Sequence, residues 1–224
     1  AYIAEFIGTC ALILFGAGSI IITQTMVGSS AALMVVALAH GLTIACMASA
    51  LGAISGGHFN PAVTFGFIVG NKMPKRKAYG YMVAQLLGAI IAALALQVLF
   101  FPETWEAARL GTPMLASNVS FLRGVFIEAI LTFFLMIVIF GTAVDSRAPK
   151  VGALFIGLTI TIDILLGGPL TGAAMNPART FGPAFIGWMG NATYSPWAGH
   201  FVYWLGPFMG AGIAALVYKK ISSQ

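Results

Sequence analysis

The sequence predicts an all-α membrane protein with six transmembrane helices and two half-length helices, arranged as an inverted repeat. The composition, the lengths of the apolar runs and a tripeptide that occurs twice indicate this fold class. Of the 224 residues, 59% are hydrophobic and only 8% are charged, whereas about a quarter are charged in ordinary soluble domains. Because so few charges cannot cover a water-facing surface, the chain belongs in a lipid bilayer.

Six apolar runs are long enough to cross a bilayer, which takes about 20 residues per helix. They cover roughly 2–23, 31–51, 79–101, 121–142, 151–166 and 197–218. The gaps between them at 52–78 and 167–196 are too apolar for plain loops, and each contains one apolar stretch, at 61–70 and 177–187. Ten helical residues rise only ~15 Å, half of the hydrocarbon core, so both stretches are predicted to be half-helices.

Most basic residues fall on one predicted side of the membrane. The net charge is +5, and eight of the eleven Lys and Arg residues lie in short polar gaps or near the C-terminus. These eight are Lys72, Lys75, Arg76, Lys77, Arg147, Lys150, Lys219 and Lys220. The positive-inside rule assigns them to the cytoplasm, and six crossings then put both termini there as well. The basic residues form no continuous face suited to nucleic acid.

The opposite side of the membrane then holds Glu103, Glu106 and Arg109, together with glycosylation sequons at Asn118 and Asn191. Sequons this short also arise by chance, so glycosylation stays open. The sequence does not indicate which membrane the protein occupies.

The two halves of the chain repeat the same motif. Gly-Gly-His-Phe-Asn-Pro-Ala stands at 56–62, and Gly-Ala-Ala-Met-Asn-Pro-Ala stands at 172–178. Each half contains three spans, an odd number, so the two copies must be inverted in the membrane relative to each other. We therefore predict a single transmembrane channel domain, 1–224, built from inverted repeats at about 1–108 and 117–224.

Each copy of the motif ends in Asn-Pro-Ala and opens one half-helix. One such tripeptide is an ordinary helix start, since Asn is a favoured N-cap and Pro a favoured first residue, but two in equivalent places are not expected by accident. The two motifs comprise Asn60, Pro61, Ala62, Asn176, Pro177 and Ala178. A helix that begins at mid-membrane has free N–H groups and a positive dipole end, and irregular backbone at that depth needs a wet cavity beside it. The two Asn amides can then donate to a water oxygen, so that this water relays no proton and cations meet an unfavourable field.

Residues 55–64, Ser-Gly-Gly-His-Phe-Asn-Pro-Ala-Val-Thr, and 176–179, Asn-Pro-Ala-Arg, resemble the signature of the aquaporin (major intrinsic protein) family. The likeness covers essentially the whole chain. It implies a passive channel that conducts water and excludes protons and ions, with ammonia or other small neutral solutes as further candidate substrates. It also implies a homotetramer with one pore per subunit, and no cofactor.

The resemblance further implies a selectivity filter lined by His40, Ile164, Ala173 and Arg179. Arg179 is the only charged residue of its half-helix, and since its charge is costly in lipid it is expected to face the pore, to cap loop carbonyls, or to do both. His40 on its own could equally make an interhelical hydrogen bond, and Ile164 and Ala173 rest on the resemblance alone. Orthodox water channels mostly carry Phe at position 40 and His at position 164. This set is more similar to plant tonoplast aquaporins and to ammonia-permeable relatives, and it implies a wider and less polar aperture.

Other polar residues inside the predicted spans are expected to be structural. Glu5 and Glu128, equivalent in the two repeats, should accept hydrogen bonds from the half-helix loops, because an unpaired carboxylate is expensive in lipid; proton-relay acids are the rival interpretation. Gln85 is expected to bond between helices, and His58 to be structural too. Asp163 should point about 100° away from the pore-facing position that follows it, which favours a buried partner over a gate.

Glycerol conduction is the first alternative function. Glycerol facilitators usually carry Asp after the Arg of the second motif and a basic residue four positions further on. Here those positions hold Thr180 and Ala184, and Tyr203-Trp204 in the last helix resembles the water-channel pattern. Glycerol facilitation is therefore the weaker interpretation.

Functions of other classes, a secondary transporter or an enzyme, fit the sequence less well. A secondary transporter could share the inverted repeat, but it needs a coupling-ion site, and the acids here are few and scattered. An enzyme is not expected, because His40, His58 and His200 fall on separate segments without a nucleophile beside them. Cys10 and Cys46 lie in apolar runs, where thiols pack as small hydrophobes, so we expect neither a disulfide nor a metal site.

Overall fold

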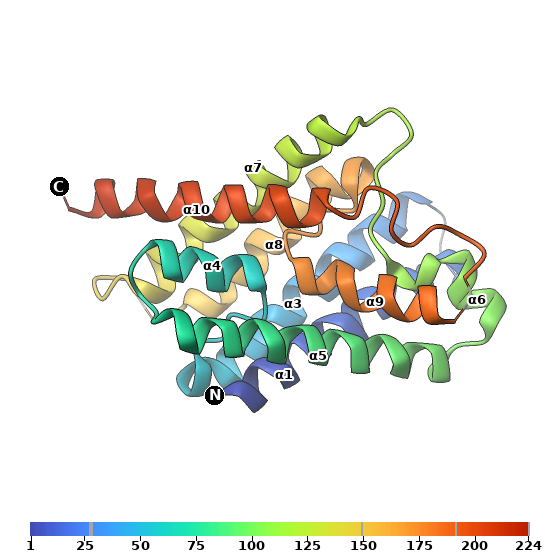
Figure 1. Ribbon diagram of the computed structural model, residues 1–224, viewed down its shortest axis with the longest axis horizontal. Helices are drawn as coiled ribbons and strands as arrows, with labels where there is room; N and C mark the ends of the chain where they lie inside the picture. The colour runs from blue at the N-terminus through green and yellow to red at the C-terminus, as the bar shows by residue number, and fades with distance from the viewer. Residues whose placement is uncertain (27–28, 149, 191, 224) are drawn as a thin grey trace.

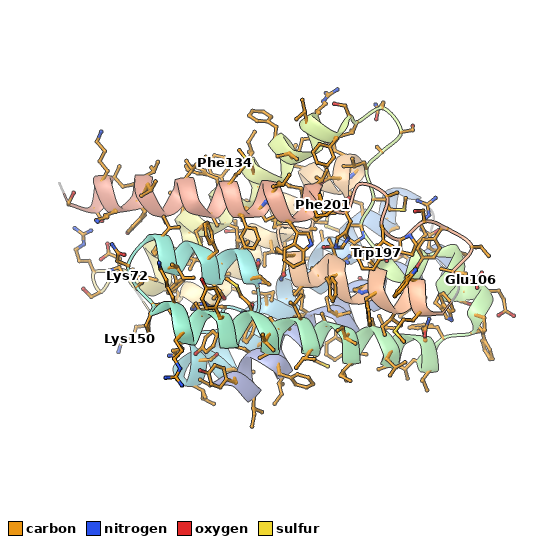
Figure 2. The ribbon with its side chains drawn as sticks, viewed as in Figure 1. Lys72, Glu106, Phe134, Lys150, Trp197 and Phe201 are labelled. Carbon is orange, nitrogen blue, oxygen red and sulfur yellow. The ribbon has the colours of Figure 1, made fainter. Side chains whose placement is uncertain are left out.

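The computed structural model covers residues 1–224 and describes all of them except 27–28, 149, 191 and 224. Every regular element among the described residues is a helix. The long helices form one elongated bundle, with both chain ends toward the same side of the view (Figure 1). Lys72 and Lys150 lie at that end and Glu106 lies at the opposite end (Figure 2). One of the two predicted glycosylation sequons, at Asn191, falls outside the described residues.

Six helical segments run the length of the bundle. The first is continuous through α1 (Tyr2–Ala11), the π-helical turn η1 (Leu12–Ala17) and α2 (Gly18–Met26). The others are α3 (Ser29–Ser55), α5 (Lys75–Leu99), α7 (Phe121–Ile139) with its π-helical extension η3 (Phe140–Val144), α8 (Gly152–Thr171) and α10 (Val202–Ser222). Among the described residues, five segments are long and apolar enough to cross a membrane. The sixth, α10, falls below that apolarity, but its 21 residues rise about 30 Å, the thickness of a bilayer core.

Two short helices fill the middle of the bundle. These are α4 (Pro61–Val69) and α9 (Pro177–Met189), and each begins at the proline of an Asn-Pro-Ala motif. They lie end to end between α5 and α10 (Figure 1), and they contact each other and both of those helices. Their N-termini meet inside the protein and their C-termini point to opposite ends of the bundle, which is the arrangement that two inverted copies require.

The ends of the helices differ from the predicted spans by up to five residues, and the two largest differences are in α8 and α10. The span predicted at 151–166 continues to Thr171, because Gly167 and Gly168 pack tightly under Leu131 and Leu33 and stay helical; the helix ends only at Gly172, with φ +82°. The span predicted at 197–218 begins at Val202 instead. Residues 197–201 form turns that include Gly199 at φ +69°.

The loop after α5 contains two short helices that the sequence did not predict. These are α6 (Pro102–Ala107) and the 3₁₀ turn η2 (Arg109–Gly111). Within η2, Leu110 is fully buried and adopts a left-handed conformation with φ +51°. The loop is therefore folded against the bundle rather than lying free above it.

Glycines allow the long helices to approach closely. A Cβ at Gly210 of α10 would overlap the carbonyl oxygen of Ala129 on α7, and a Cβ at Gly88 of α5 would overlap that of Phe6 on α1. Helices in lipid associate through such close packing, since apolar burial gives them little driving force there. Large apolar side chains cover the outside instead, for example Val98 at 81% and Leu122 at 78% exposure.

We expect Gly210→Ala to lower the free energy of unfolding by about 1–3 kcal/mol, because the added methyl group meets the Ala129 backbone rather than a movable side chain. Thermal unfolding in detergent micelles, followed by circular dichroism, measures the change. Gly52→Ala is the matched control, because nothing lies within 4 Å of the Cβ that it would add. An unchanged melting temperature for Gly210→Ala would contradict the packing described for α7 and α10.

Candidate conduction pathway

A narrow cavity runs through the centre of the bundle, where the two half-helices meet. The space open to the centre of a water-sized sphere is about 30 Å³, enough for more than one water molecule, since one needs roughly 10–15 Å³ on this measure. The cavity is lined by Asn60 and Asn176 and by all four predicted filter residues, His40, Ile164, Ala173 and Arg179. The structure thus brings together residues that lie up to 139 positions apart in the chain.

The rest of the cavity wall is mainly apolar. Its apolar side chains come from both repeats and include Leu12, Ile44, Val63, Leu135, Ile139, Ile156 and Ile160. A wall of this kind offers few hydrogen bonds, so a solute in the cavity must find its partners at the few polar positions.

The two Asn side chains brace the half-helices against each other. Asn60 Oδ1 accepts hydrogen bonds from Ala62 N at 2.8 Å and Val63 N at 3.5 Å, which caps its own helix α4. Its Nδ2 donates across to Met175 O at 2.8 Å. Asn176 repeats this arrangement: its Oδ1 caps α9, and its Nδ2 donates to Phe59 O at 2.9 Å. An amide nitrogen carries two hydrogens, so each Asn keeps one N–H for the cavity that it lines.

The loop before α4 is held by a buried carboxylate. Glu5 is fully buried on α1, and its two oxygens accept from His58 N at 3.0 Å and Phe59 N at 2.7 Å. Gln85 of α5 donates to Glu5 Oε2 at 2.8 Å, so this contact joins two spans and the loop. Phe59 adopts φ +49°, an unfavourable region for a side chain of its size, and the paired N–H groups keep it there.

The loop before α9 is held in the same way by the second repeat. Glu128 is fully buried on α7 and accepts from Ala174 N at 3.0 Å, from Met175 N at 2.7 Å and from the Thr171 hydroxyl at 2.6 Å. Met175 adopts φ +51°, close to the value at its counterpart in the first repeat. Because the N–H groups of both loops face the carboxylates, the loop carbonyls are left for the cavity. Those of residues 56–58 and 172–174 accept no hydrogen bond from the described part of the chain.

Arg179 is held by two neutral acceptors. It is 2% exposed; its Nε donates to His40 Nε2 at 3.2 Å and its Nη1 donates to Gly111 O at 2.8 Å. His40 Nδ1 lies 2.8 Å from Val36 O, a carbonyl that can only accept, so Nδ1 carries the hydrogen. Nε2 is then the acceptor for Arg179, and the imidazole in this arrangement is neutral.

Ile164 and Ala173 form the remaining wall of the predicted filter. Ile164 lies on α8 and is 3% exposed, so its side chain closes the cavity with an apolar surface. Ala173 adopts φ +45°, and its N–H donates to the Thr171 hydroxyl at 3.1 Å. This loop thus presents the carbonyl and the methyl group of Ala173 beside the Arg179 guanidinium.

Two of the polar residues predicted to be structural share one network. His58 Nδ1 lies 3.1 Å from the Thr64 hydroxyl, which also accepts from Gln85 Nε2 at 3.0 Å and donates to Asn60 O at 3.0 Å. His58 also lines the cavity. It therefore has both a structural contact and a surface in the pathway.

The buried partner expected for Asp163 is not found. Its Oδ2 atom is buried and has no hydrogen-bond partner among the described residues. Asp163 does not line the central cavity either, so the structure supports neither of the two interpretations weighed for it.

The sequence predicted no structural contact for Tyr81 or Tyr203, which occupy equivalent places in the two repeats. Tyr81 of α5 donates to Ser55 O, and Tyr203 of α10 donates to Thr171 O, each at 2.7 Å. Both hydroxyls tie the third span of a repeat to the start of that repeat's loop. An alignment of the two halves against each other could have found this pair, because the tyrosines stand 21 and 27 residues after their motif's asparagine.

The family model described as Major intrinsic protein matches residues 1–218. The chain belongs to the major intrinsic protein family. It is 42% identical to "Probable aquaporin TIP3-2" of Arabidopsis thaliana, over 98% of this chain and 82% of that relative. It is 40% identical to "Aquaporin TIP4-4" of Zea mays, over 99% of this chain and 86% of the relative.

A solved structure is similar throughout. It is titled "X-ray structure of the aquaglyceroporin from Plasmodium falciparum", with a TM-score of 0.87 and 26% identity, over 99% of this chain and 95% of that one. The predicted membrane fold of six spans and two half-helices is confirmed by this likeness and by the family match. Major intrinsic proteins are channels, so the expectation that the chain is not an enzyme is confirmed as well.

We expect Glu128→Gln to destabilise this major intrinsic protein by about 1–3 kcal/mol, because the new amide nitrogen leaves one buried loop donor unpaired. The loop before α9 should loosen, so that both the melting temperature in detergent and the water permeability in liposomes fall. Glu103→Gln, on the exposed turn of α6, is the control. A Glu128→Gln protein with native melting and native permeability would show that the carboxylate is not what holds the loop.

Proposed function

We propose that this chain conducts water passively through the central cavity, one molecule behind another. The observation that carries the proposal is the meeting of Asn60 and Asn176 across the pathway, each with one amide N–H left over. Both lie at the start of a half-helix, so the positive ends of two helix dipoles also converge there.

The converging donors act on the orientation of a passing water molecule. When a water oxygen accepts hydrogen bonds from both Asn amides, its two hydrogens must point away along the pathway. Such a water has no lone pair free to accept a proton from its neighbour, so a proton cannot be relayed past it. A cation meets the same two dipole ends and is repelled, whereas neutral water is not.

Arg179 is the second barrier to cations. Its Nε and Nη1 are engaged by His40 and Gly111, and the remaining N–H groups are available to water. Its charge is not matched by a carboxylate within salt-bridge distance, since the only ion pair in the described ranges joins Arg147 to Asp145. The electric field of the guanidinium therefore reaches the pathway. The loop carbonyls can accept the hydrogen bonds of a water molecule that has left its water neighbours behind.

In proteoliposomes under an osmotic gradient, the purified protein should give rapid shrinkage with a low activation energy, because water exchanges hydrogen bonds stepwise along the pathway. Stopped-flow light scattering measures the rate, and a pH-sensitive dye in the same vesicles should report no added proton leak. Water permeability equal to that of empty liposomes would refute the proposal.

Ammonia is a second candidate substrate. Ile164 contributes no hydrogen bond to the aperture, and the His40 imidazole is turned to Arg179 by its Nε2 atom. With fewer polar groups at the narrow point, water loses part of its advantage over a weaker hydrogen bonder. The permeant form is neutral ammonia, because the charge of Arg179 opposes ammonium.

We expect the pair of substitutions His40→Phe with Ile164→His to reduce ammonia permeability several-fold relative to water, because it narrows the aperture and restores a polar wall. Alkalinisation inside liposomes in an ammonium gradient measures the ammonia flux, and the osmotic assay measures water. If the double variant carries ammonia as fast as the native chain, broadened selectivity is wrong while the water-channel proposal stands.

Glycerol conduction is slow in this proposal. Thr180 is fully buried and its hydroxyl donates to Pro177 O of its own helix at 2.9 Å, so it is turned away from the pathway. Ala184 is also fully buried. Neither position supplies the polar wall that a polyol would need.

The proposal extends to the assembly of the protein and to its orientation in the membrane. The basic end of the bundle with both termini faces the cytoplasm by the positive-inside rule. Four copies assemble into a tetramer with one pathway each, as the family resemblance implies. The similarity to plant TIP aquaporins favours a vacuolar membrane.

A further inference from the structure

The two acceptors that hold Arg179 both rest on the same short stretch of the first span. His40 Nε2 and the Gly111 carbonyl come from α3 and from the loop turn η2, far apart in the sequence. Behind them lie Gly16 and Ala17, the last two residues of the π-helical turn η1. Neither residue touches the pathway, since neither lines the cavity.

Gly16 leaves the space that the His40 ring occupies. A Cβ built at Gly16 would lie 2.6 Å from both Cδ2 and Nε2 of His40. Nε2 is the atom that accepts from Arg179, and the other ring nitrogen is fixed to Val36 O. A methyl group at position 16 must therefore push the ring toward the lumen and disturb both of its hydrogen bonds.

Ala17 supports the turn that presents the Gly111 carbonyl. A Cβ built at Gly111 would lie 2.7–2.9 Å from the Cβ, O and Cα atoms of Ala17, so the two backbones are in direct contact. The turn is strained, because Arg109, Leu110 and Gly111 adopt φ of +52°, +51° and +69° in succession. Left-handed non-glycine residues persist only where surrounding contacts hold them.

Gly16 and Ala17 are consecutive in the chain, yet they contact different parts of the filter, because successive helical residues are rotated by about 100°. A π turn shifts the phase of a helix locally, and such turns are frequent at functional sites. The carbonyl of Gly16, at the end of the turn, accepts a hydrogen bond from the Ser19 hydroxyl of α2 at 2.6 Å. Gly16 lies against the His40 ring on α3, and Ala17 lies against Gly111 in η2.

We propose that the π turn of the first span is a positioning element for the filter, in which Gly16 sets the place of the His40 ring and Ala17 sets the place of the Gly111 carbonyl. Together they fix the orientation of Arg179 and so the size of solute that passes. The inference rests on the proposed water conduction and adds two positioning residues that have no contact with the solute.

The test compares Gly16→Ala with the native chain in proteoliposomes, measuring water and glycerol permeability on the same vesicles. Because the ring is displaced into the aperture, glycerol should be hindered more than water, and the glycerol-to-water ratio should fall about tenfold, equivalent to about 1.4 kcal/mol in relative barrier. Gly52→Ala, with open space at its Cβ, should leave both permeabilities at native values. A native ratio for Gly16→Ala would overturn the proposal.

A double-mutant cycle separates the contact with His40 from a general effect on the helix. In a His40→Ala background there is no ring to displace, so Gly16→Ala should change the ratio no further. An equal change in both backgrounds would overturn the proposal, because the methyl group would then act without His40. If Gly16→Ala folds only when combined with His40→Ala, that rescue supports the contact.

Ala17→Gly supplies the second variant if Gly16→Ala folds in neither background. Removing the Cβ of Ala17 leaves a gap behind Gly111, so the Gly111 carbonyl no longer fixes the Arg179 guanidinium. The ratio of glycerol to water permeability should therefore rise. A native ratio for Ala17→Gly, when Gly16→Ala cannot be made, would overturn the proposal. Absence of water conduction by the native chain is a different result, because it removes the proposed function itself.

Discussion

The structure depends on how two loops satisfy their backbone N–H groups in the middle of a bilayer. The surrounding lipid offers no hydrogen bonds at that depth, and each unpaired group there costs several kcal/mol. Glu5 and Glu128 supply the acceptors, one for each loop, and each carboxylate takes two successive N–H groups. Without them, these loop N–H groups would be left unpaired inside the bilayer.

The polar groups along the proposed pathway follow from this pairing of the loop N–H groups with the two carboxylates. Since the N–H groups turn toward the carboxylates, the carbonyls turn the other way, and the asparagine that follows each loop can cap its own helix while donating to the opposite loop. The cross-brace then places two helix N-termini against each other. The polar groups and the positive field on which the proposed water conduction and cation exclusion depend thus both arise from the requirement to bury the loop backbone.

The sequence was sufficient for the parts that obey this requirement. Acids are rare inside the spans, so Glu5 and Glu128 stood out, and the Asn-Pro-Ala pair located both half-helices to within two residues of their observed ends. Hydropathy located the spans because lipid imposes a length on them. Each of these signals reflects a rule that acts locally along the chain.

The remaining features depend on contacts between segments, which no local pattern encodes. The turn at Gly111 packs directly on Ala17, and nothing in the loop sequence indicates that its carbonyl reaches Arg179. No residue pattern in the sequence indicates the π turn η1 either. Asp163 was expected to find a partner because buried acids usually do, and its unpaired oxygen has no explanation in the contacts around it.

The partners of Arg179 leave its charge unneutralised, as the proposed filter requires. A buried guanidinium is ordinarily stabilised by a carboxylate, and a salt bridge would satisfy its donors well. A carboxylate in that place would also cancel the field that opposes cations. Here the donors meet a neutral imidazole and a backbone carbonyl, which satisfy the hydrogen bonds and leave the net charge intact. In the proposed function, the choice of acceptor therefore decides whether Arg179 only stabilises the fold or also repels cations from the pathway, and His40 and Gly111 permit both.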